Sequence, residues 1–91
     1  MMMEYEQYFA MTLQQKLKKR VIGKIYVKIT MNDEILVLIE REDELKFRMF
    51  ISNFTRKVID GLSTDYVARM VIKEYREFII ARMNEKYFYA S

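Results

Sequence analysis

The residue types that carry most enzyme chemistry are missing from this chain. It contains no histidine and no cysteine, which removes Ser-His-Asp and Cys-His catalysis and the usual zinc sites. It also lacks a glycine-rich phosphate loop. The groups that remain are carboxylates, lysines and tyrosines. We therefore expect a protein that is not an enzyme, with no catalytic residues and no cofactor, and we identify no small-molecule substrate.

The densest group of carboxylates falls within residues 40–44. It consists of Glu40, Glu42, Asp43 and Glu44. Carboxylate oxygens suit hard cations, but this group lacks the alternating ligand spacing and the central glycine of a calcium loop. Runs of charge usually face water. We expect a solvated turn at these residues and no metal site.

Basic residues form two groups that could contact nucleic acid. The net charge of +3 is uneven, because residues 1–30 and 46–91 each carry +4 while residues 31–45 carry −5. One group ends the first predicted helix and continues along the next strand: Lys16, Lys18, Lys19, Arg20, Lys24, Tyr26 and Lys28. The other group is a ridge on the last predicted helix: Arg69, Lys73 and Arg76.

A basic strip with an aromatic side chain can follow a phosphate backbone and stack a base. The same residues are also explained without a ligand. Lysines at a helix C-terminus complement the helix dipole, and a strand face that carries charge is ordinarily solvated. We favour this second interpretation, and nucleic-acid binding is the alternative function.

One helix, residues 63–89, is the element around which the rest of the chain must pack. Ser63 or Thr64 is placed to cap its first turn, and Asp65 suits the positive end of its dipole. Apolar residues recur at steps of three and four and form a core face. They are Ala68, Val71, Ile72, Tyr75, Phe78, Ile79 and Met83.

Further apolar residues of this helix lie outside that core face. They are Val67, Met70, Ile80 and the aromatic tail Tyr87, Phe88 and Tyr89. Apolar side chains beside a wide core stripe indicate a second covered surface, formed by the N-terminal helix or by another copy of the chain. We expect a small interaction protein that self-associates through this helix and tail as a homo-oligomer, with a dimer favoured.

The other segments predict a single α+β domain over residues 1–91. Residues 4–20 predict a helix with an i+4 stripe of Tyr5, Phe9, Leu13 and Leu17, and residues 24–31 alternate as a half-buried strand with Met31 on its inner face. Residues 35–41 are apolar on both faces at first, as in a central strand covered on both sides. Residues 45–51 predict a third strand, and residues 54–60 a short helix capped by Ser52 or Asn53 and ended by Gly61.

The predicted order is α-β-β-β-α-α, a three-stranded antiparallel meander packed against the long C-terminal helix. One alternative stays open. Phe47, Phe50, Ile51, Phe54 and Val58 also form a helical stripe, so residues 43–60 could be one helix, giving a β-hairpin with three helices. We favour the strand because two strands alone are marginally stable.

The chain is expected to be cytoplasmic and to make no membrane contact. Its apolar runs are shorter than the roughly 20 residues that span a bilayer, and its first residues are acidic where a secretion signal is basic. Residues 54–88, in which Gly61, Leu62 and Ser63 lead into a long helix containing Tyr75, resemble short uncharacterised proteins encoded by prophages and mobile elements of Gram-positive bacteria. This resemblance implies a genomic setting and assigns no activity or site residue.

Overall fold

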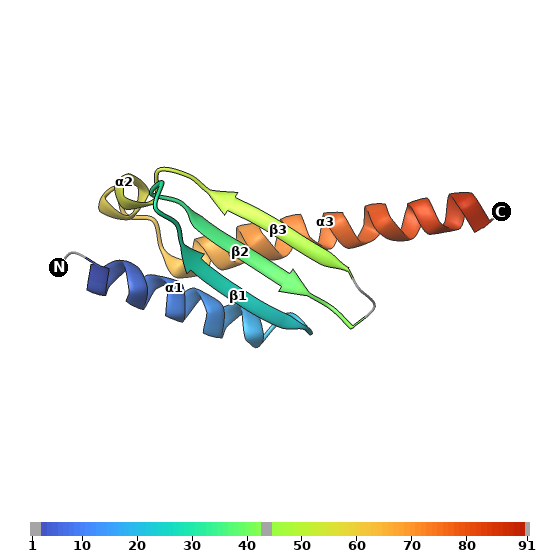
Figure 1. The fold of residues 1–91 in the computed structure, drawn as a ribbon, viewed down its shortest axis with the longest axis horizontal. Helices are drawn as coiled ribbons and strands as arrows, with labels where there is room; N and C mark the ends of the chain where they lie inside the picture. The colour runs from blue at the N-terminus through green and yellow to red at the C-terminus, as the bar shows by residue number, and fades with distance from the viewer. Residues whose placement is uncertain (1–2, 43–44, 91) are drawn as a thin grey trace.

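The fold is a three-stranded antiparallel sheet with helices on one of its faces. The computed structural model describes residues 3–42 and 45–90, with side chains for residues 5–42, 45–58 and 60–84. The elements in chain order are α1 (Met3–Lys18), β1 (Lys24–Ile29), β2 (Ile35–Glu40), β3 (Lys46–Ile51), α2 (Phe54–Ile59) and α3 (Thr64–Ala90) (Figure 1). The strand order β1-β2-β3 confirms the predicted meander and the α+β class.

Residues 46–51 form a strand because they complete the hydrogen bonding of β2. The two strands pair along their whole length, from Ile35 opposite Ile51 to Glu40 opposite Lys46. Phe47 and Ile51 point into the core, whereas Phe50 points away from it. The alternative of a single helix over residues 43–60 is therefore wrong. A third strand supplies backbone partners to the second edge of β2, which a helix would leave unpaired.

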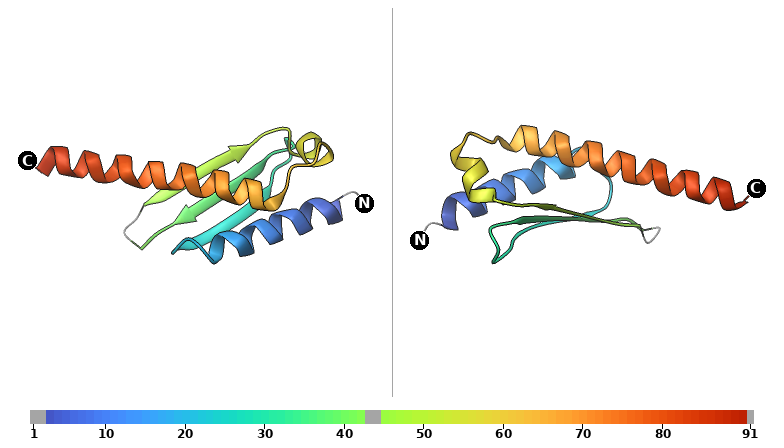
Figure 2. Two further views of the ribbon diagram at one scale, coloured as in Figure 1. Left: turned by 180° about the vertical axis from the view of Figure 1, so that it is seen from behind. Right: turned by 90° about the horizontal axis from the view of Figure 1, so that it is seen from above.

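All three helices lie on the same side of the sheet (Figure 2). α1 packs along β1 and against α3, and α3 also contacts β3. No element of the described chain covers the opposite face of the sheet. This corrects the prediction that the central strand is covered on both sides. Leu36 and Leu38 of β2 point to the uncovered face and are only half-buried, while Val37 between them is fully buried.

The core fills the space between the inner face of the sheet and the helices. Its largest fully buried side chains come from every element except β1 and β3: Phe54, Leu13, Leu17, Ile35, Ile39, Val37, Val67 and Val71. Two edge-to-face ring pairs connect the elements. Phe9 of α1 lies 4.9 Å from Phe54 of α2, and Phe47 of β3 lies 5.5 Å from Tyr75 of α3, measured between ring centroids.

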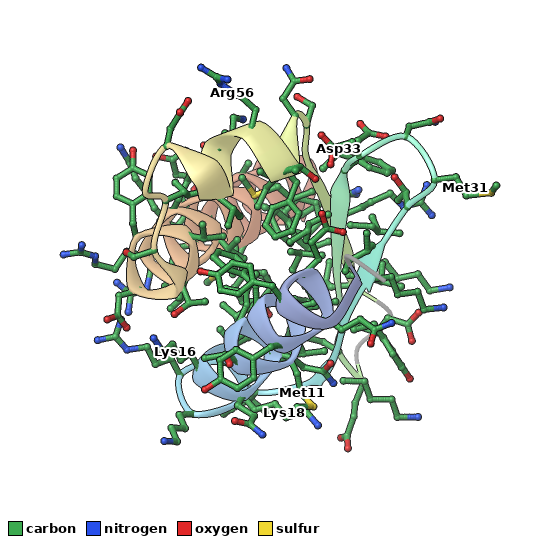
Figure 3. The ribbon with its side chains drawn as sticks, turned by 90° about the vertical axis from the view of Figure 1, so that its left-hand side faces the viewer. Met11, Lys16, Lys18, Met31, Asp33 and Arg56 are labelled. Carbon is green, nitrogen blue, oxygen red and sulfur yellow. The ribbon has the colours of Figure 1, made fainter. Side chains whose placement is uncertain are left out.

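Three predicted core residues are exposed instead. Tyr5 lies near the N-terminal end of α1, Met31 follows the end of β1 in the turn, and Met83 belongs to the last third of α3. Figure 3 shows Met31 pointing away from the protein. In each case the apolar periodicity extends along the element beyond the part that other elements cover. The number of core residues predicted from periodicity alone is therefore too high.

The N-terminus of α2 is capped by Asp33 from the turn between β1 and β2. Asn53 precedes the helix with φ of 53° and makes no side-chain capping bond, so the predicted cap by Ser52 or Asn53 is wrong. The Asp33 main-chain oxygen accepts from the Phe54 N–H (2.9 Å). Its carboxylate accepts from the Thr55 N–H (3.0 Å) and from the Thr55 hydroxyl (2.6 Å). Figure 3 shows Asp33 beside α2.

The Thr55 hydroxyl lies between two carboxylates. Besides Asp33 it is within 2.7 Å of Glu6 Oε1 on α1, and with one proton it can donate to only one of them at a time. The carboxylate of Asp33 and the hydroxyl of Thr55 thus join the β1–β2 turn, α1 and α2.

Helix ends on either side of the α2–α3 connection follow the predicted chemistry. Gly61 has φ of 96°, its N–H donates to the Val58 carbonyl (3.0 Å), and the Leu62 N–H donates to the Lys57 carbonyl (3.0 Å). This is the Schellman arrangement that ends helices at glycine. Ser63 Oγ accepts from the Tyr66 N–H (3.1 Å), which confirms Ser63 as the cap of α3.

Asp33→Ala is expected to lower the free energy of unfolding by at least about 1 kcal/mol, the usual cost of losing an N-cap. Asp33 also has φ of 57°, a conformation that asparagine tolerates and alanine does not. Asp33→Asn keeps an accepting oxygen and this tolerance, so it should stay close to the parent protein. Urea denaturation measures both variants. Equal stability of Asp33→Ala and the parent would contradict the capping role.

Candidate functional site

The uncovered face of the sheet presents nine side chains in three cross-strand rows. The rows are Lys24–Glu40–Lys46, Tyr26–Leu38–Arg48 and Lys28–Leu36–Phe50, each running from β1 through β2 to β3. Strand alternation places these residues together because their neighbours along each strand point into the core. We call these nine residues the open sheet face.

Two exposed aromatic side chains lie on the edge strands of the open sheet face. Tyr26 of β1 is 40% exposed and Phe50 of β3 is 51% exposed. Each one has a cation across the central leucine, with Arg48 in the row of Tyr26 and Lys28 in the row of Phe50. The edge strands lie roughly 10 Å apart. A flat ring can therefore stack on either aromatic with a cation within reach on the other edge strand.

The open sheet face is basic with an apolar centre. Four of its residues are cations, and Glu40, in register between Lys24 and Lys46, is the one acid among these described strand residues. A hollow of about 200 Å³ is lined by Tyr26, Lys28, Leu36, Leu38 and Glu40. Its apolar floor and charged rim suit a planar group attached to an anion.

Three of the seven polar and aromatic positions on this face were not predicted from the sequence. Lys24, Tyr26 and Lys28 were predicted to point outward together, and the structure places them so. Lys46, Arg48 and Phe50 were not assigned to a site. The alternation of residues 45–51 contained the signal. However, only the register of β3 on β2 shows that these residues share a face with Tyr26.

The remaining predicted cations lie on the helical layer. Two adjoining hollows run between the end of α1 and α3, and Arg20 and Arg69 line both. The first is lined by Lys16, Lys19, Arg20, Asp65, Ala68 and Arg69. The second is lined by Arg20, Arg69, Ile72, Lys73, Arg76 and Glu77. We call the two hollows together the helical groove.

The two predicted basic groups are thus divided differently from the order in the sequence. Lys16, Lys19 and Arg20 of the first group line the helical groove together with the second group, Arg69, Lys73 and Arg76. Lys24 and Lys28 of the first group belong to the open sheet face. Lys18 is exposed and lines neither hollow. Figure 3 shows Lys16 and Lys18 leaving α1 in different directions.

Lys16 connects α1 to the first turn of α3. Its Nζ donates to Thr64 Oγ1 (2.6 Å) and forms an ion pair with Asp65 Oδ1 (2.7 Å). The hydrogen bond from Lys16, and then its charge, lower the pKa of the Asp65 carboxyl below its ordinary value, with smaller contributions from Arg69 and Arg20. Much of the Lys16 charge is therefore matched within the protein.

The acidic cluster shows no built site. Glu40 belongs to the open sheet face and Glu42 is exposed after β2, while Asp43 and Glu44 lie outside the described residues. Over residues 5–42, 45–58 and 60–84, no group of three or more metal-ligating side chains is placed to hold an ion.

The residues predicted for self-association are divided by the packing of α3. Val67 is fully buried and Met70 packs against the core. Both therefore belong to the core between the sheet, α1 and α3, and they are not part of the predicted self-association surface. Ile80 is 56% exposed, and Met83, one turn later, is 58% exposed. The C-terminal part of α3 continues past the end of the sheet (Figure 1). The side chains of Tyr87, Phe88 and Tyr89 lie outside the described residues.

These features define a two-layer α+β domain with an open sheet face, a basic helical groove and a projecting C-terminal helix. No helix in the described ranges is both long and apolar enough to cross a membrane. Comparison with protein-family models, with curated proteins and with solved structures finds no match to the chain.

Lys16→Met is expected to raise the pKa of Asp65 toward its ordinary value of 3.8, because the hydrogen bond from Lys16 and its charge are the two largest causes of the lowering. Because the pKa is lowered in the folded state, the pair stabilises the fold above pH 3.8, and this contribution is lost as the pH falls through the folded value. NMR of the carboxyl carbon during acid titration measures the pKa. Lys18→Met, with the same loss of charge on α1, should leave it unchanged. Equal shifts in both variants would contradict the specific pair.

Proposed function

We propose that the chain binds single-stranded nucleic acid on the open sheet face. The observation that carries this proposal is the presence of Tyr26 and Phe50, both exposed, among four cations on a face that no described element covers. Bases stack on aromatic side chains regardless of their identity, and neighbouring lysines and arginines contact the phosphates. Unpaired bases offer the faces that this stacking needs, so single strands are favoured over duplexes.

The composition of the open sheet face argues against a simple solvated surface. The solvent side of an antiparallel sheet usually carries polar residues, but here four of the nine positions are Tyr26, Leu36, Leu38 and Phe50. A surface that exposes these side chains beside cations has both of the components required for stacking and for phosphate contact.

Charge also argues against a second copy of the chain as the occupant of this face. Two sheets stacked by a two-fold axis would bring four cations of each copy together, with only Glu40 from each to balance them. Burying charges without partners is costly. A polyanion removes that cost, so the open sheet face suits nucleic acid better than self-association.

Tyr26→Ala and Phe50→Ala are each expected to weaken binding of a labelled single-stranded oligonucleotide roughly 5- to 150-fold, the equivalent of losing about 1–3 kcal/mol of stacking per base. Fluorescence anisotropy with single-stranded DNA and RNA measures the affinity. Tyr8→Ala removes an exposed tyrosine of α1 outside this face and should have no effect.

Salt dependence provides the second half of this test. The affinity should fall steeply with salt, and Arg48→Gln should reduce the slope of log K against log salt by about 0.7, the value for one lost phosphate contact on a single strand. Absence of binding at low salt, or equal losses in Tyr8→Ala and Tyr26→Ala, would contradict the proposal.

A second proposal is self-association through the projecting part of α3. It rests on Ile80 and Met83, which are exposed one turn apart where α3 continues past the sheet. Residues three apart share a helix face, so they form a small apolar surface that a second helix can cover. This surface is separate from the open sheet face, and the two proposals are compatible.

The double variant Ile80→Lys/Met83→Lys is expected to convert a dimer into a monomer, measured by size-exclusion chromatography with light scattering. Ala81→Lys/Asn84→Lys adds the same two charges at exposed positions with the same spacing, and should remain a dimer. A parent protein that is monomeric at all concentrations would rule out the proposal.

A further inference from the structure

We infer that the helical groove is a second nucleic-acid site, which binds the phosphate backbone of a duplex without regard to its bases. It lies on the helical layer, whereas the open sheet face is on the other side of the sheet. The inference does not depend on the sheet-face proposal, because it uses none of the same residues.

Charge is the first argument for this site. The residues that line the groove include six cations and two carboxylates. One of these carboxylates, Asp65, already pairs with Lys16 at 2.7 Å. The groove therefore keeps an excess of positive charge after its own ion pair is counted, and its ligand should be a polyanion.

The geometry of the cations is the second argument. Arg69, Lys73 and Arg76 follow one another along α3 at steps of four and three residues, which corresponds to a rise of roughly 6 and 4.5 Å. Arg20, from the α1–β1 connection, lines the same groove. A line of cations suits a ligand with repeated phosphates. The arginines among them can each donate two parallel hydrogen bonds to a phosphate group.

The lining chemistry distinguishes this groove from the open sheet face. Its apolar lining consists of Ala68 and Ile72, and neither hollow is lined by an aromatic ring. The lining of the groove therefore offers no aromatic ring on which an unpaired base can stack. A duplex, whose bases are already stacked and whose phosphates are dense, fits such a site better than a single strand. The small apolar lining also offers little to the side chains of an acidic protein segment.

Binding of a blunt DNA duplex of arbitrary sequence, measured by fluorescence anisotropy over a range of salt concentrations, tests the inference. Arg69→Gln/Lys73→Gln should weaken binding at low salt at least 10-fold. It should also reduce the slope of log K against log salt by about 2, because each lost phosphate contact contributes about 0.9. Glutamine preserves helix propensity, so the variant is expected to fold, and circular dichroism verifies this.

Two matched controls make the test specific. Arg56→Gln/Lys57→Gln removes the same charge from α2 and should change the slope little. Tyr26→Ala/Phe50→Ala should leave duplex affinity within about twofold of the parent, whatever it does to single strands. Failure of the sheet-face proposal would appear only in the single-strand measurements.

Three results would overturn the inference. The first is no duplex binding at low salt. The second is an equal loss in the Arg56/Lys57 and Arg69/Lys73 variants, which would indicate a general charge effect. The third is displacement of the duplex by poly-glutamate as effectively as by unlabelled duplex at the same charge concentration, which would assign the groove to an acidic protein partner.

Discussion

The whole structure depends on one packing interface, between the inner face of a small sheet and a single layer of helices. The central strand contributes Ile35, Val37 and Ile39, all fully buried, and α1, α2 and α3 all pack on that side. No element of the described chain packs on the opposite side of the sheet. The other face of the sheet therefore stays open, although Leu36 and Leu38 make it more apolar than an ordinary solvent-facing sheet. The candidate site is a direct consequence of this imbalance.

Polar contacts between distant segments also join the helices to one another and to the sheet. Asp33 and Thr55 join a hairpin turn to α1 and α2, and Lys16 joins α1 to the start of α3. These contacts are partly or fully exposed to solvent, so their contribution to stability is small beside that of the core. Each contact links a particular position on one element to a particular position on another. The Lys16 contact joins the end of α1 to the first turn of α3, beside the helical groove that Arg20 and Arg69 line.

The two basic surfaces differ in what they offer a ligand. The open sheet face is flat, with aromatic rings and leucines between cations, and the helical groove is lined by cations with only two apolar side chains. A ligand that exposes both bases and phosphates suits the first surface, and one that exposes mainly phosphates suits the second. The projecting part of α3 adds a third, apolar surface away from both. These three surfaces are the ones on which the proposed binding roles rest.

Periodicity in the sequence indicated the type and order of the helices and of the first two strands, because a period of 2 or 3.6 residues is a local property of the chain. Residues 45–51 fitted both periods, and their pairing with β2 decided that they form a strand. The residue types at two positions also indicated helix ends: Gly61 the end of α2 and Ser63 the start of α3. Three other features depended on the tertiary structure: that the helices cover only one face of the sheet, that Asp33 rather than Asn53 caps α2, and that Phe50 and Arg48 share a surface with Tyr26. Each of these depends on contacts between residues far apart in the chain, such as the 22 residues that separate Asp33 from Thr55. Local patterns predict which side of an element is apolar, but only packing decides which apolar side is covered.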